Sequence, residues 1–441
     1  MMTKKRTSYI CTACGNEYNK WLGKCPACGE WNSIVEAAPN VKKETTHEVI
    51  PLAEVHFNGH ERISTAIDEY NLVCGGGMVP GSVILIGGEP GIGKSTLALQ
   101  IAASLKTVYL SGEESPIQIK QRSERLGING ESIHVSTNTN VDSIIHMIEN
   151  EKPECVIVDS VQTLYLSDVP GLIGSVSQIK ESTSRIAEIA KKKNIPFILI
   201  GHITKDGSIA GPKQLEHLVD TVLYFEGDFS KEFRILRAFK NRFGSINEIG
   251  LFAMTEKGLK EVKDKNIFIN PFSSDAPGNA VSAALEGSRI LLFEVQSLVT
   301  WTSFTNPRRM ADGFDLNRLT LIIAVLEKHA QLKLSNFDVF INVAGGFQID
   351  EPSADLAVAM AITSSLKNKP IPSGIGFIAE ISLSGELRPT SQCQRRVLDL
   401  GRSGFHTVIL SQKNYTEAKQ ATFSGDIVGL DTIAKAIEYI F

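Results

Sequence analysis

Short apolar runs alternate with stretches of helix-forming residues from about residue 82 to residue 200. The apolar runs, each typical of a strand that is buried on both faces, are 82–87, 107–110, 155–159 and 196–200. The helix-forming stretches are 96–103, 117–126 and 176–193. Strands that alternate with helices in this way predict a parallel sheet covered by helices on both faces.

The pattern changes from about residue 270 onward. Strands are expected near both ends of 281–296 and from residue 337, and helices at 318–330 and 353–362. We therefore expect a second domain of mixed α and β structure in the C-terminal part of the chain. Residues 37–46 follow neither period, which indicates a linker.

A glycine-rich turn joins the first apolar run to the first helical stretch. Backbone N–H groups and the helix dipole converge at such a turn, which suits a phosphate group. Lys94 would reach the β- and γ-phosphates of a nucleotide, and the Ser95 hydroxyl would bind Mg²⁺. The residues predicted to bind ATP here are Gly88, Glu89, Pro90, Gly91, Ile92, Gly93, Lys94, Ser95 and Thr96.

Three further side chains follow apolar runs, at the strand ends where parallel sheets bind ligands. Asp159 is expected to hold Mg²⁺ through water, and the alternative is an aspartate that caps a turn. Glu113 would polarise the attacking water, with Glu114 as the second choice and an ordinary acidic helix start as the alternative. His202 would contact the nucleotide and sense its γ-phosphate. Two polar loops near these strand ends, 167–177 and 205–213, are candidates for contact with a single nucleic-acid strand or ordinary surface turns.

Four of the seven cysteines lie in two Cys-x-x-Cys-Gly turns near the N-terminus. Cys11 and Cys14 form the first pair, and Cys25 and Cys28 form the second. Four thiolates at this spacing predict a closed tetrahedral site for Zn²⁺, with iron as the alternative metal. A redox role is disfavoured, because the motif occurs twice.

The composition limits the possible partners. A net charge of −4 over 441 residues provides no general basic field, so nucleic acid has to be bound by local basic patches. No apolar stretch typical of a signal peptide follows the basic N-terminus, and no apolar run approaches the roughly 18 residues that span a bilayer. We therefore expect a cytoplasmic protein without membrane contact.

The order of the motifs resembles that of one family. The cysteine turns precede the phosphate loop, Leu-Ser-Gly-Glu-Glu-Ser at 110–115, Val-Asp-Ser at 158–160 and Gly-His-Ile-Thr-Lys at 201–205. Lys-Asn-Arg-Phe-Gly follows at 240–244. This order, over nearly the whole chain, is similar to that of the bacterial RadA (Sms) family of DNA repair ATPases.

The resemblance implies a RecA-like parallel-sheet P-loop ATPase core, with an N-terminal four-cysteine zinc knuckle and a C-terminal Lon-protease-like α+β domain. The implied domains are a zinc finger at 1–36, a linker at 37–55, the ATPase domain at 56–265 and the Lon-like domain at 266–441. The implied function is a DNA-dependent, helicase-like motor that forms a ring, expected to be a hexamer, and promotes branch migration of strand-exchange products in DNA repair. The implied partners are single-stranded and branched DNA and a filament of a RecA-type recombinase.

Two basic residues of the last motif fit a ring. Lys240 and Arg242 of one subunit would reach the ATP of its neighbour, where Arg242 would act as an arginine finger. The alternative is a solvated basic hairpin. An ATP-regulated switch that binds DNA without translocation also stays open as an alternative to the motor.

The Lon-like segment places Ser353 at the nucleophile position, where we expect alanine in this family. A serine needs a neighbouring base, which is a lysine in Lon. We place Gln394 at the position of that lysine, and neither an amide nor an arginine accepts the proton. We therefore expect a scaffold instead of a serine peptidase. Its arginines would contact phosphates and ring neighbours, or form surface ion pairs: Arg308, Arg309, Arg388, Arg395 and Arg396.

Overall fold

The computed structural model describes residues 9–11, 17–18, 20–27, 29–36, 62–202, 215–227, 233–263, 269, 276–304, 306–346 and 348–441. The chain forms two compact units, Met1–Gly59 and His60–Phe441. The predicted linker at 37–55 and the predicted loop at 205–213 lie outside the described residues.

The N-terminal unit contains a small antiparallel sheet in the order β2-β1-β3. Its strands are β1 Tyr9–Cys11, β2 Glu17–Tyr18 and β3 Ile34–Glu36. Cys25 and Ile34 are buried here and pack against Tyr18 and Leu22. A core of this size does not stabilise a fold without a further crosslink such as a metal ion.

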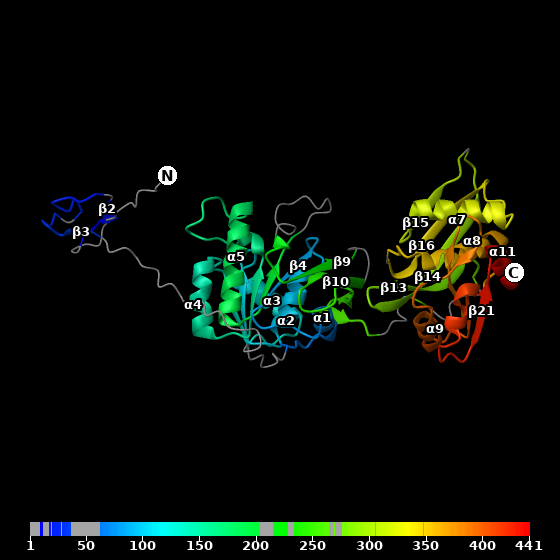
Figure 1. The fold of residues 1–441 in the computed structure, drawn as a ribbon, viewed down its shortest axis with the longest axis horizontal. Helices are drawn as coiled ribbons and strands as arrows, with labels where there is room; N and C mark the ends of the chain where they lie inside the picture. Colours follow the sequence, from blue (N-terminus) through cyan, green and yellow to red (C-terminus); the bar gives the residue numbers. More distant parts are fainter. Residues whose placement is uncertain are drawn as a thin grey trace, which may run out of the picture. The chain divides into compact units, whose positions relative to one another are not determined.

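The second unit begins with a nine-stranded sheet in the order β12-β11-β10-β9-β4-β8-β7-β5-β6 (Figure 1). The strands from β9 to β6 run parallel, and β10, β11 and β12 extend the sheet with antiparallel pairing. The bounds are β4 Val83–Gly88, β5 Thr107–Ser111, β6 Ile133–Ser136, β7 Cys155–Asp159, β8 Phe197–Ile200, β9 Thr221–Glu226, β10 Phe233–Asn241, β11 Ile249–Thr255 and β12 Gly258–Glu261.

Helices cover both faces of this sheet (Figure 1). On one face lie α1 Asp68–Val73, α2 Lys94–Ala102 and α3 Pro116–Arg125; on the other lie α4 Val141–Glu151 and α5 Val176–Lys193. The short 3-10 helix η2 Val161–Thr163 follows β7. Along β4, Ile84 and Ile86 belong to the first core, whereas Val83 and Leu85 belong to the second. This two-sided burial explains why the strand is continuously apolar, as the sequence predicted.

The sequence pattern predicted the four central strands β4, β5, β7 and β8 of the parallel sheet. Helix α5 has the predicted bounds, and it begins where the Ser175 side chain accepts a hydrogen bond from the Gln178 N–H. Strand β6 was missed, and only the end of β10 was predicted, as a strand that leads into a turn at 237–244, because the residues of these strands are partly buried or alternate between buried and half-exposed. Such strands lack the continuous apolar run on which the prediction was based.

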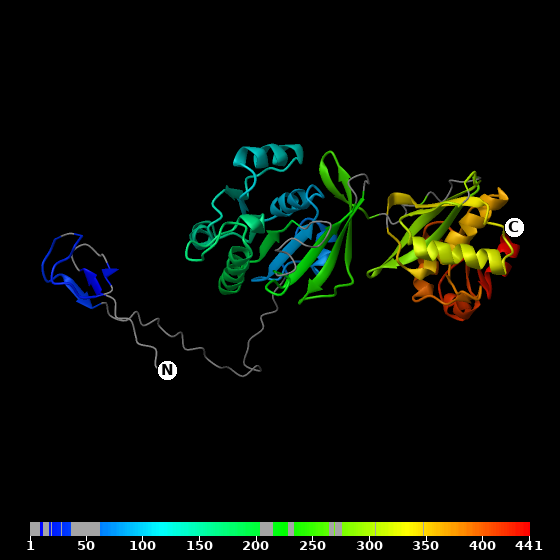
Figure 2. The ribbon, with the colours of Figure 1, turned by 90° about the horizontal axis from the view of Figure 1, so that it is seen from above.

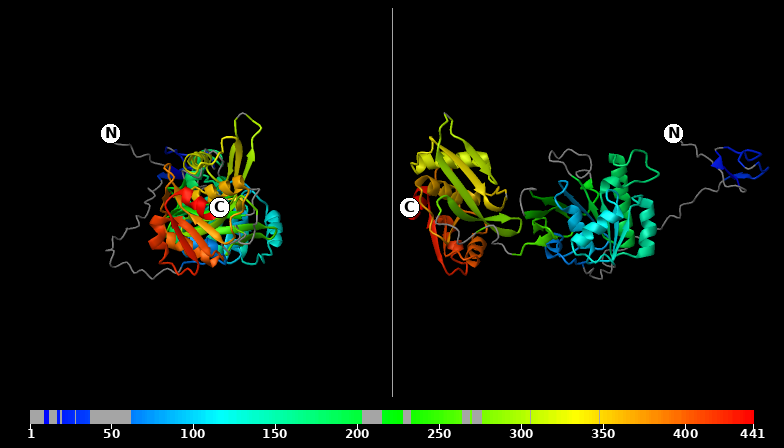
Figure 3. Two further views of the ribbon diagram at one scale, coloured as in Figure 1. Left: turned by 90° about the vertical axis from the view of Figure 1, so that its right-hand side faces the viewer. Right: turned by 180° about the vertical axis from the view of Figure 1, so that it is seen from behind.

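A separate seven-stranded sheet follows, in the order β15-β16-β14-β13-β17-β20-β21. Its strands are β13 Asn279–Glu286, β14 Arg289–Trp301, β15 Arg309–Asp312, β16 Phe337–Val343, β17 Ile375–Ile378, β20 Thr407–Ser411 and β21 Asp426–Leu430. A two-stranded sheet pairs β18 Glu380–Ile381 with β19 Leu387–Arg388. The end of β14 and the start of β15 both pair with the start of β16, so three strands form this end of the sheet (Figure 3). Because β12 belongs to the first sheet and β13 to the second, the two sheets separate between residues 261 and 279. The domain boundary expected at residue 266 lies in this interval and stays a prediction.

Helices also cover both faces of the second sheet (Figure 2). One group is α7 Leu316–His329, α8 Asp355–Lys367 and α11 Ile433–Ile440, and the other is α9 Cys393–Arg402 and α10 Tyr415–Ala418. Short 3-10 helices are η3 Ala344–Gly346, η4 Pro352–Ala354 and η5 Gln412–Asn414. Within the described part of the chain, every helix is too short or too polar to cross a bilayer.

The turn between β13 and β14 contacts the first domain through charged side chains. Both terminal nitrogens of Arg289 bind the Glu69 carboxylate of α1, at 2.9 and 3.0 Å. The Glu69 carboxylate also accepts a hydrogen bond from the Leu251 N–H at 2.8 Å. The side chains of Arg289 and Glu69 are only 19% and 8% exposed, so this ion pair is poorly hydrated.

We expect Arg289→Ala to lower the free energy of unfolding by about 3 kcal/mol, because Glu69 would keep a buried charge without its partner. Thermal unfolding followed by calorimetry measures this loss. Arg185→Ala is the matched control, since Arg185 and its partner Asp142 are 42% and 51% exposed and lie 3.9 Å apart. The control should unfold like the wild type. Equal melting temperatures for Arg289→Ala and the control would contradict the expectation.

Candidate nucleotide-binding site

The predicted phosphate loop, residues 88–95, joins β4 to α2. Gly88 and Gly93 have φ angles of 156° and 116°. A Cβ atom at Gly88 would lie 2.7 Å from the carbonyl oxygen of Phe225, and one at Gly93 would lie 2.8 Å from Cε of Met254. The loop therefore requires glycine at both positions, for its backbone angles and for its close packing on the sheet.

Lys94 is the first residue of α2, and its side chain is almost fully buried. Its Nζ donates hydrogen bonds to the carbonyl oxygens of Gly88 and Glu89, both at 2.8 Å. Burial lowers the pKa of Lys94 from 10.5 to about 8, although the nearby carboxylates of Asp159, Glu113 and Glu89 favour the charged form. A bound phosphate would favour the protonated ammonium in the same way.

Asp159 is the last residue of β7 and is 5% exposed. Its Oδ2 accepts a hydrogen bond of 2.7 Å from the hydroxyl of Tyr109, which lies in the neighbouring strand β5. The Asp159–Ser160 peptide bond is cis. Carboxylate and hydroxyl oxygens are the ligands that Mg²⁺ prefers, so Asp159 and Ser95 fit the predicted metal role.

Glu113 and Glu114 follow β5 and differ in their contacts. The Glu113 Oε1 atom accepts a hydrogen bond from the Ser160 hydroxyl and lies 3.2 Å from Nε2 of His202. Glu114 instead forms an ion pair with Arg122 of α3. Glu113 is therefore joined to the ends of β7 and β8, and Glu114 is occupied elsewhere, which favours Glu113 as the candidate base.

The parallel sheet brings four predicted side chains to one edge. Asp159 ends β7, and Lys94, Glu113 and His202 follow β4, β5 and β8; the carboxyl ends of these four strands lie side by side. Lys94 is close enough to Glu113 and Asp159 for both carboxylates to affect its pKa. Sequence reasoning missed Tyr109 and Ser160, which contact two of these residues; their only signals were the position of Tyr109 two residues before the strand end and that of Ser160 directly after Asp159.

Arg242 lies at the opposite edge of the sheet. Because β10 runs antiparallel to β9, the residues after β10 lie where β4 and β9 begin. The Arg242 Nη1 atom is 3.2 Å from Oδ1 of Asp220, whose Oδ2 accepts a hydrogen bond from the N–H of Val83 at the start of β4. The six residues of β4 span about 20 Å, so the Arg242 side chain does not reach the phosphate loop of its own chain.

Lys240 is anchored at the same edge. Its Nζ donates to the carbonyl oxygens of Glu216 and Val219, at 2.6 and 2.8 Å. Burial and the neighbouring Arg242 charge lower the pKa of Lys240. Lys240 therefore holds the turn before β9, whereas the Arg242 side chain is 52% exposed and accessible to another molecule.

The predicted zinc site is only partly described. Cys14 and Cys28 lie outside the described residues, and Cys11 is described only as a part of β1. Cys25 is buried, and its Sγ lies 3.1 Å from the Tyr18 hydroxyl. Among the described residues no cluster of three or more metal-binding side chains occurs. The buried thiol of Cys25, in a turn closed by the Gly29 N–H to Cys25 O hydrogen bond of 2.9 Å, fits one half of a four-thiolate site.

The structure corrects the residue placed opposite Ser353. Nη1 of Arg396, not Gln394, lies 3.1 Å from the Ser353 hydroxyl. Gln394 donates instead to the carbonyl oxygen of Gln420 at the surface. The side chain that contacts Ser353 is thus an arginine, and the correspondence of Gln394 to the Lon lysine stays a prediction. A guanidinium does not accept the proton of a serine hydroxyl, and the Glu351 carboxylate pairs with this guanidinium.

The arginines of the C-terminal domain are less available than expected. Arg396 is fully buried, so its predicted phosphate contact is wrong. Arg309 donates to the carbonyl oxygens of Leu334 and Phe337, and Arg395 donates to that of Ser288. Three of the predicted arginines are exposed: Arg308, which lies 3.9 Å from the ring of Phe304, Arg388 and Arg395.

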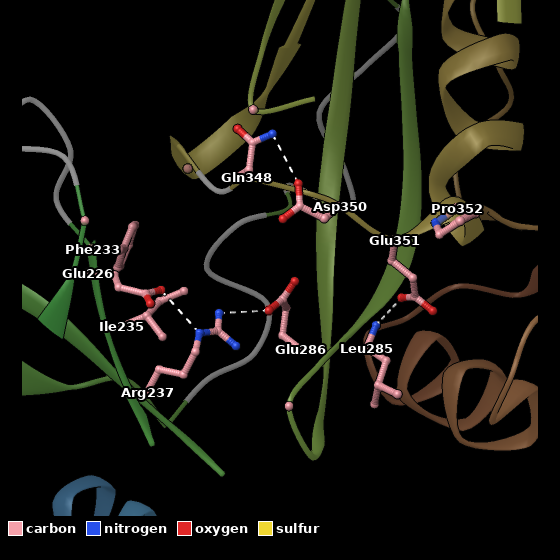
Figure 4. A pocket seen from close by; sticks show the side chains of 14 residues that line it. Glu226, Phe233, Ile235, Arg237, Leu285, Glu286, Gln348, Asp350, Glu351 and Pro352 are labelled. Carbon is pink, nitrogen blue, oxygen red and sulfur yellow. Dashed lines mark hydrogen bonds and ion pairs between the residues drawn. The ribbon is translucent and has the colours of Figure 1, made fainter. Parts of the chain in front are cut away.

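A pocket of about 860 Å³ lies away from the phosphate loop, between β10 and the first strands of the C-terminal domain (Figure 4). Arg237 crosses it and pairs with Glu226 at 3.3 Å and with Glu286 at 3.1 Å. Burial raises the pKa of Glu286, although Arg237 favours its charged form. The single charge of Arg237 therefore compensates only one of these two carboxylates, and none of the predicted ATP-binding residues lines the pocket.

A phosphate loop at the carboxyl edge of a parallel sheet, with an acidic residue ending a neighbouring strand, defines a RecA-like P-loop ATPase. Three family profiles match parts of the chain: a rubredoxin metal binding domain at residues 9–36, the KaiC ATPase at 63–141, and the Lon protease (S16) C-terminal proteolytic domain at 321–423. They confirm the predicted fold class of zinc ribbon, RecA-like core and Lon-like domain.

Curated relatives cover almost the full length. The chain is 45% identical over 456 residues to the DNA repair protein RadA of Bacillus subtilis (strain 168), covering 99% of both chains. It is 46% identical over 449 residues to RadA of Aquifex aeolicus (strain VF5), covering 100% of both. The chain belongs to the RadA family, as its motifs predicted. A solved structure of the RadB recombinase aligns with 45% of this chain and 99% of its own, at 24% identity and a TM-score of 0.37, and adds nothing to this assignment.

The lowered pKa of Lys94 predicts a pH dependence of stability. Below pH 8 the folded protein holds a poorly hydrated ammonium; from pH 8 to pH 10.5 the folded protein has lost this proton while the unfolded chain retains it. Stability therefore rises with pH across this window. We expect the melting temperature of the nucleotide-free protein, relative to Lys94→Met, to increase from pH 8 to pH 10.5.

Scanning fluorimetry at constant ionic strength measures this difference. Lys120→Met, which removes a lysine that is 64% exposed, serves as the control and should differ from the wild type by a constant amount. A constant difference for Lys94→Met as well would show that burial does not affect the ionisation of Lys94.

Proposed function

We propose that this chain is a DNA-stimulated ATPase that acts as a helicase-like motor in DNA repair and recombination. Its RadA relatives are named as DNA repair proteins, and its ATPase core matches the KaiC profile. The observation that carries the proposal is the edge of the sheet where Lys94, Glu113 and Asp159 follow adjacent parallel strands.

The residues of this edge divide the work of ATP hydrolysis. Backbone N–H groups of the loop and the start of α2 bind the phosphates, and Lys94 moves its ammonium from backbone carbonyls to phosphate oxygens. Ser95 and Asp159 would hold Mg²⁺, which neutralises charge on the phosphates when bound. Glu113 orients the attacking water and accepts its proton, and His202 holds the same carboxylate from the next strand.

Arg242 acts on the nucleotide of a neighbouring subunit. It lies about 20 Å from its own phosphate loop along β4, and its side chain is half-exposed. An arginine finger with this geometry has to come from another copy in head-to-tail contact, and we propose that the copies close into a ring, expected to be a hexamer. Hydrolysis then depends on assembly.

The DNA contact is assigned to the loop that follows β7. Leu172 and Ile173 of this loop are 85% and 59% exposed, which is unusual for apolar side chains without a partner surface. The loop begins beyond η2, where the Gln162 amide donates to the carbonyl oxygen of His202 at 3.4 Å. A change at the γ-phosphate is therefore passed from His202 toward the DNA loop through one hydrogen bond. Single-stranded and branched DNA are the proposed ligands.

The zinc knuckle is proposed to hold Zn²⁺ through Cys11, Cys14, Cys25 and Cys28. Trp21 and Trp31 of this unit are 56% and 68% exposed, and exposed tryptophans are typical of surfaces that bind a partner. A recombinase filament of the RecA type is the proposed partner, and the cytoplasm is the proposed location.

A forked DNA substrate separates a motor from a switch. We expect the wild-type protein to displace the strand with ATP and Mg²⁺, and Lys94→Ala to displace none, because its loop no longer binds the phosphates productively. Strand displacement is followed by fluorescence, with a non-hydrolysable ATP analogue as the control. ATP-dependent DNA binding without displacement by the wild type would overturn the motor and support a switch.

The trans role of Arg242 is tested by mixing subunits. Arg242→Ala should bind ATP like the wild type but hydrolyse it at least about a hundredfold more slowly. In an equal mixture with Lys94→Ala, about one quarter of the interfaces of a random ring join the intact phosphate loop of an Arg242→Ala subunit to the intact Arg242 of a Lys94→Ala subunit. The rate of ATP hydrolysis should therefore return to about one quarter of the wild-type rate. Arg402→Ala removes an arginine that is 75% exposed and should hydrolyse ATP normally. Failure of the mixture to recover activity would exclude action in trans.

A further inference from the structure

Tyr109 contacts the predicted Mg²⁺ ligand from the interior of the sheet. It lies two residues before Ser111, the residue of β5 that pairs with Asp159 of β7. Alternate residues of a strand point to the same face, so the ring of Tyr109 leans along β5 toward the strand end. There its hydroxyl donates a 2.7 Å hydrogen bond to Oδ2 of Asp159.

Packing alone does not explain this hydroxyl. Tyr109 is 1% exposed and belongs to an apolar core that includes Leu97 and Ile157. Phenylalanine would fill the same space and would not bring a polar group into the core. A buried hydroxyl without a partner lowers stability, and the Tyr109 hydroxyl finds its partner by donating its hydrogen bond to the Asp159 carboxylate.

We propose that Tyr109 is a positioning residue for Asp159 in the ATPase reaction. Its hydroxyl occupies Oδ2 and fixes the rotation of the carboxylate, which leaves Oδ1 as the oxygen available to Mg²⁺ and its water. Partners that orient metal ligands in this way commonly strengthen metal binding by about 10- to 100-fold. The inference rests on the proposed function, because it takes Asp159 as the residue that holds Mg²⁺ through water.

The test is metal affinity without turnover. Mn²⁺ replaces Mg²⁺ and is titrated into the full-length protein with a non-hydrolysable ATP analogue, with bound metal measured by electron paramagnetic resonance. We expect Tyr109→Phe to bind Mn²⁺ about tenfold more weakly than the wild type. Binding of the same analogue in the presence of a chelator should be unchanged, since no contact of Tyr109 with the nucleotide is proposed.

Tyr70→Phe is the matched control. Tyr70 is also fully buried in the same core, and its hydroxyl lies beside Cys74 instead of Asp159. This variant loses a buried hydroxyl at a distance from the metal ligand and should bind Mn²⁺ like the wild type. Tyr109→Met removes the hydroxyl while keeping an apolar side chain, and provides a second measurement if Tyr109→Phe does not fold.

Wild-type Mn²⁺ affinity in a folded variant without the Tyr109 hydroxyl would overturn the proposal. An equal loss of affinity in Tyr70→Phe would also overturn it, because the effect would then come from the core and not from Asp159. Both results are independent of strand displacement. A protein that binds Mn²⁺ as expected but unwinds no DNA would contradict only the motor.

Discussion

The parallel register of β4, β8, β7 and β5 is the constraint on which the rest of the structure depends. These strands are buried on both faces, so a slip by one residue would exchange the side chains of the two cores. With the register fixed, every strand ends at the same edge, and the residues that follow the strands meet there. Lys94, Glu113, Asp159 and His202 are far apart in the sequence and become neighbours for this reason alone. The site is therefore a consequence of how the sheet is buried.

The antiparallel extension of the sheet has a different consequence. It returns the chain to the edge where the parallel strands begin, and so places Arg242 at the far end of β4 from the phosphate loop. Asp220 connects Arg242 to the start of β4, since its carboxylate binds the Arg242 guanidinium and accepts a hydrogen bond from the first N–H of β4. One subunit thus presents the phosphate loop at one edge of the sheet and the half-exposed Arg242 at the other, and the proposed contact between subunits rests on this separation.

In the C-terminal domain, the Ser353 hydroxyl faces a buried cation. Arg396 lies against the Ser353 hydroxyl and forms an ion pair with Glu351, and its guanidinium also donates to the carbonyl oxygen of Ala283. A fully buried cation needs all of these partners. The group next to the Ser353 hydroxyl is thus a permanent cation, which holds Glu351 in the loop before α8 and accepts no proton.

The sequence by itself determined the fold class, the phosphate loop, the family and the order of the strand-end residues, because continuous apolar runs and glycine-rich turns are local signals. Tertiary structure decided which side chains meet. In the folded chain Glu113 contacts Ser160 and His202, whereas Glu114 pairs with Arg122. The sequence, in which the two glutamates are adjacent, does not show which of them has which partner. Tertiary structure also placed Arg396, and not Gln394, opposite Ser353, since a helix orients residues two positions apart in different directions. It also brought Tyr109 to Asp159, a contact that depends on the pairing of β5 with β7 and on the length of one aromatic side chain.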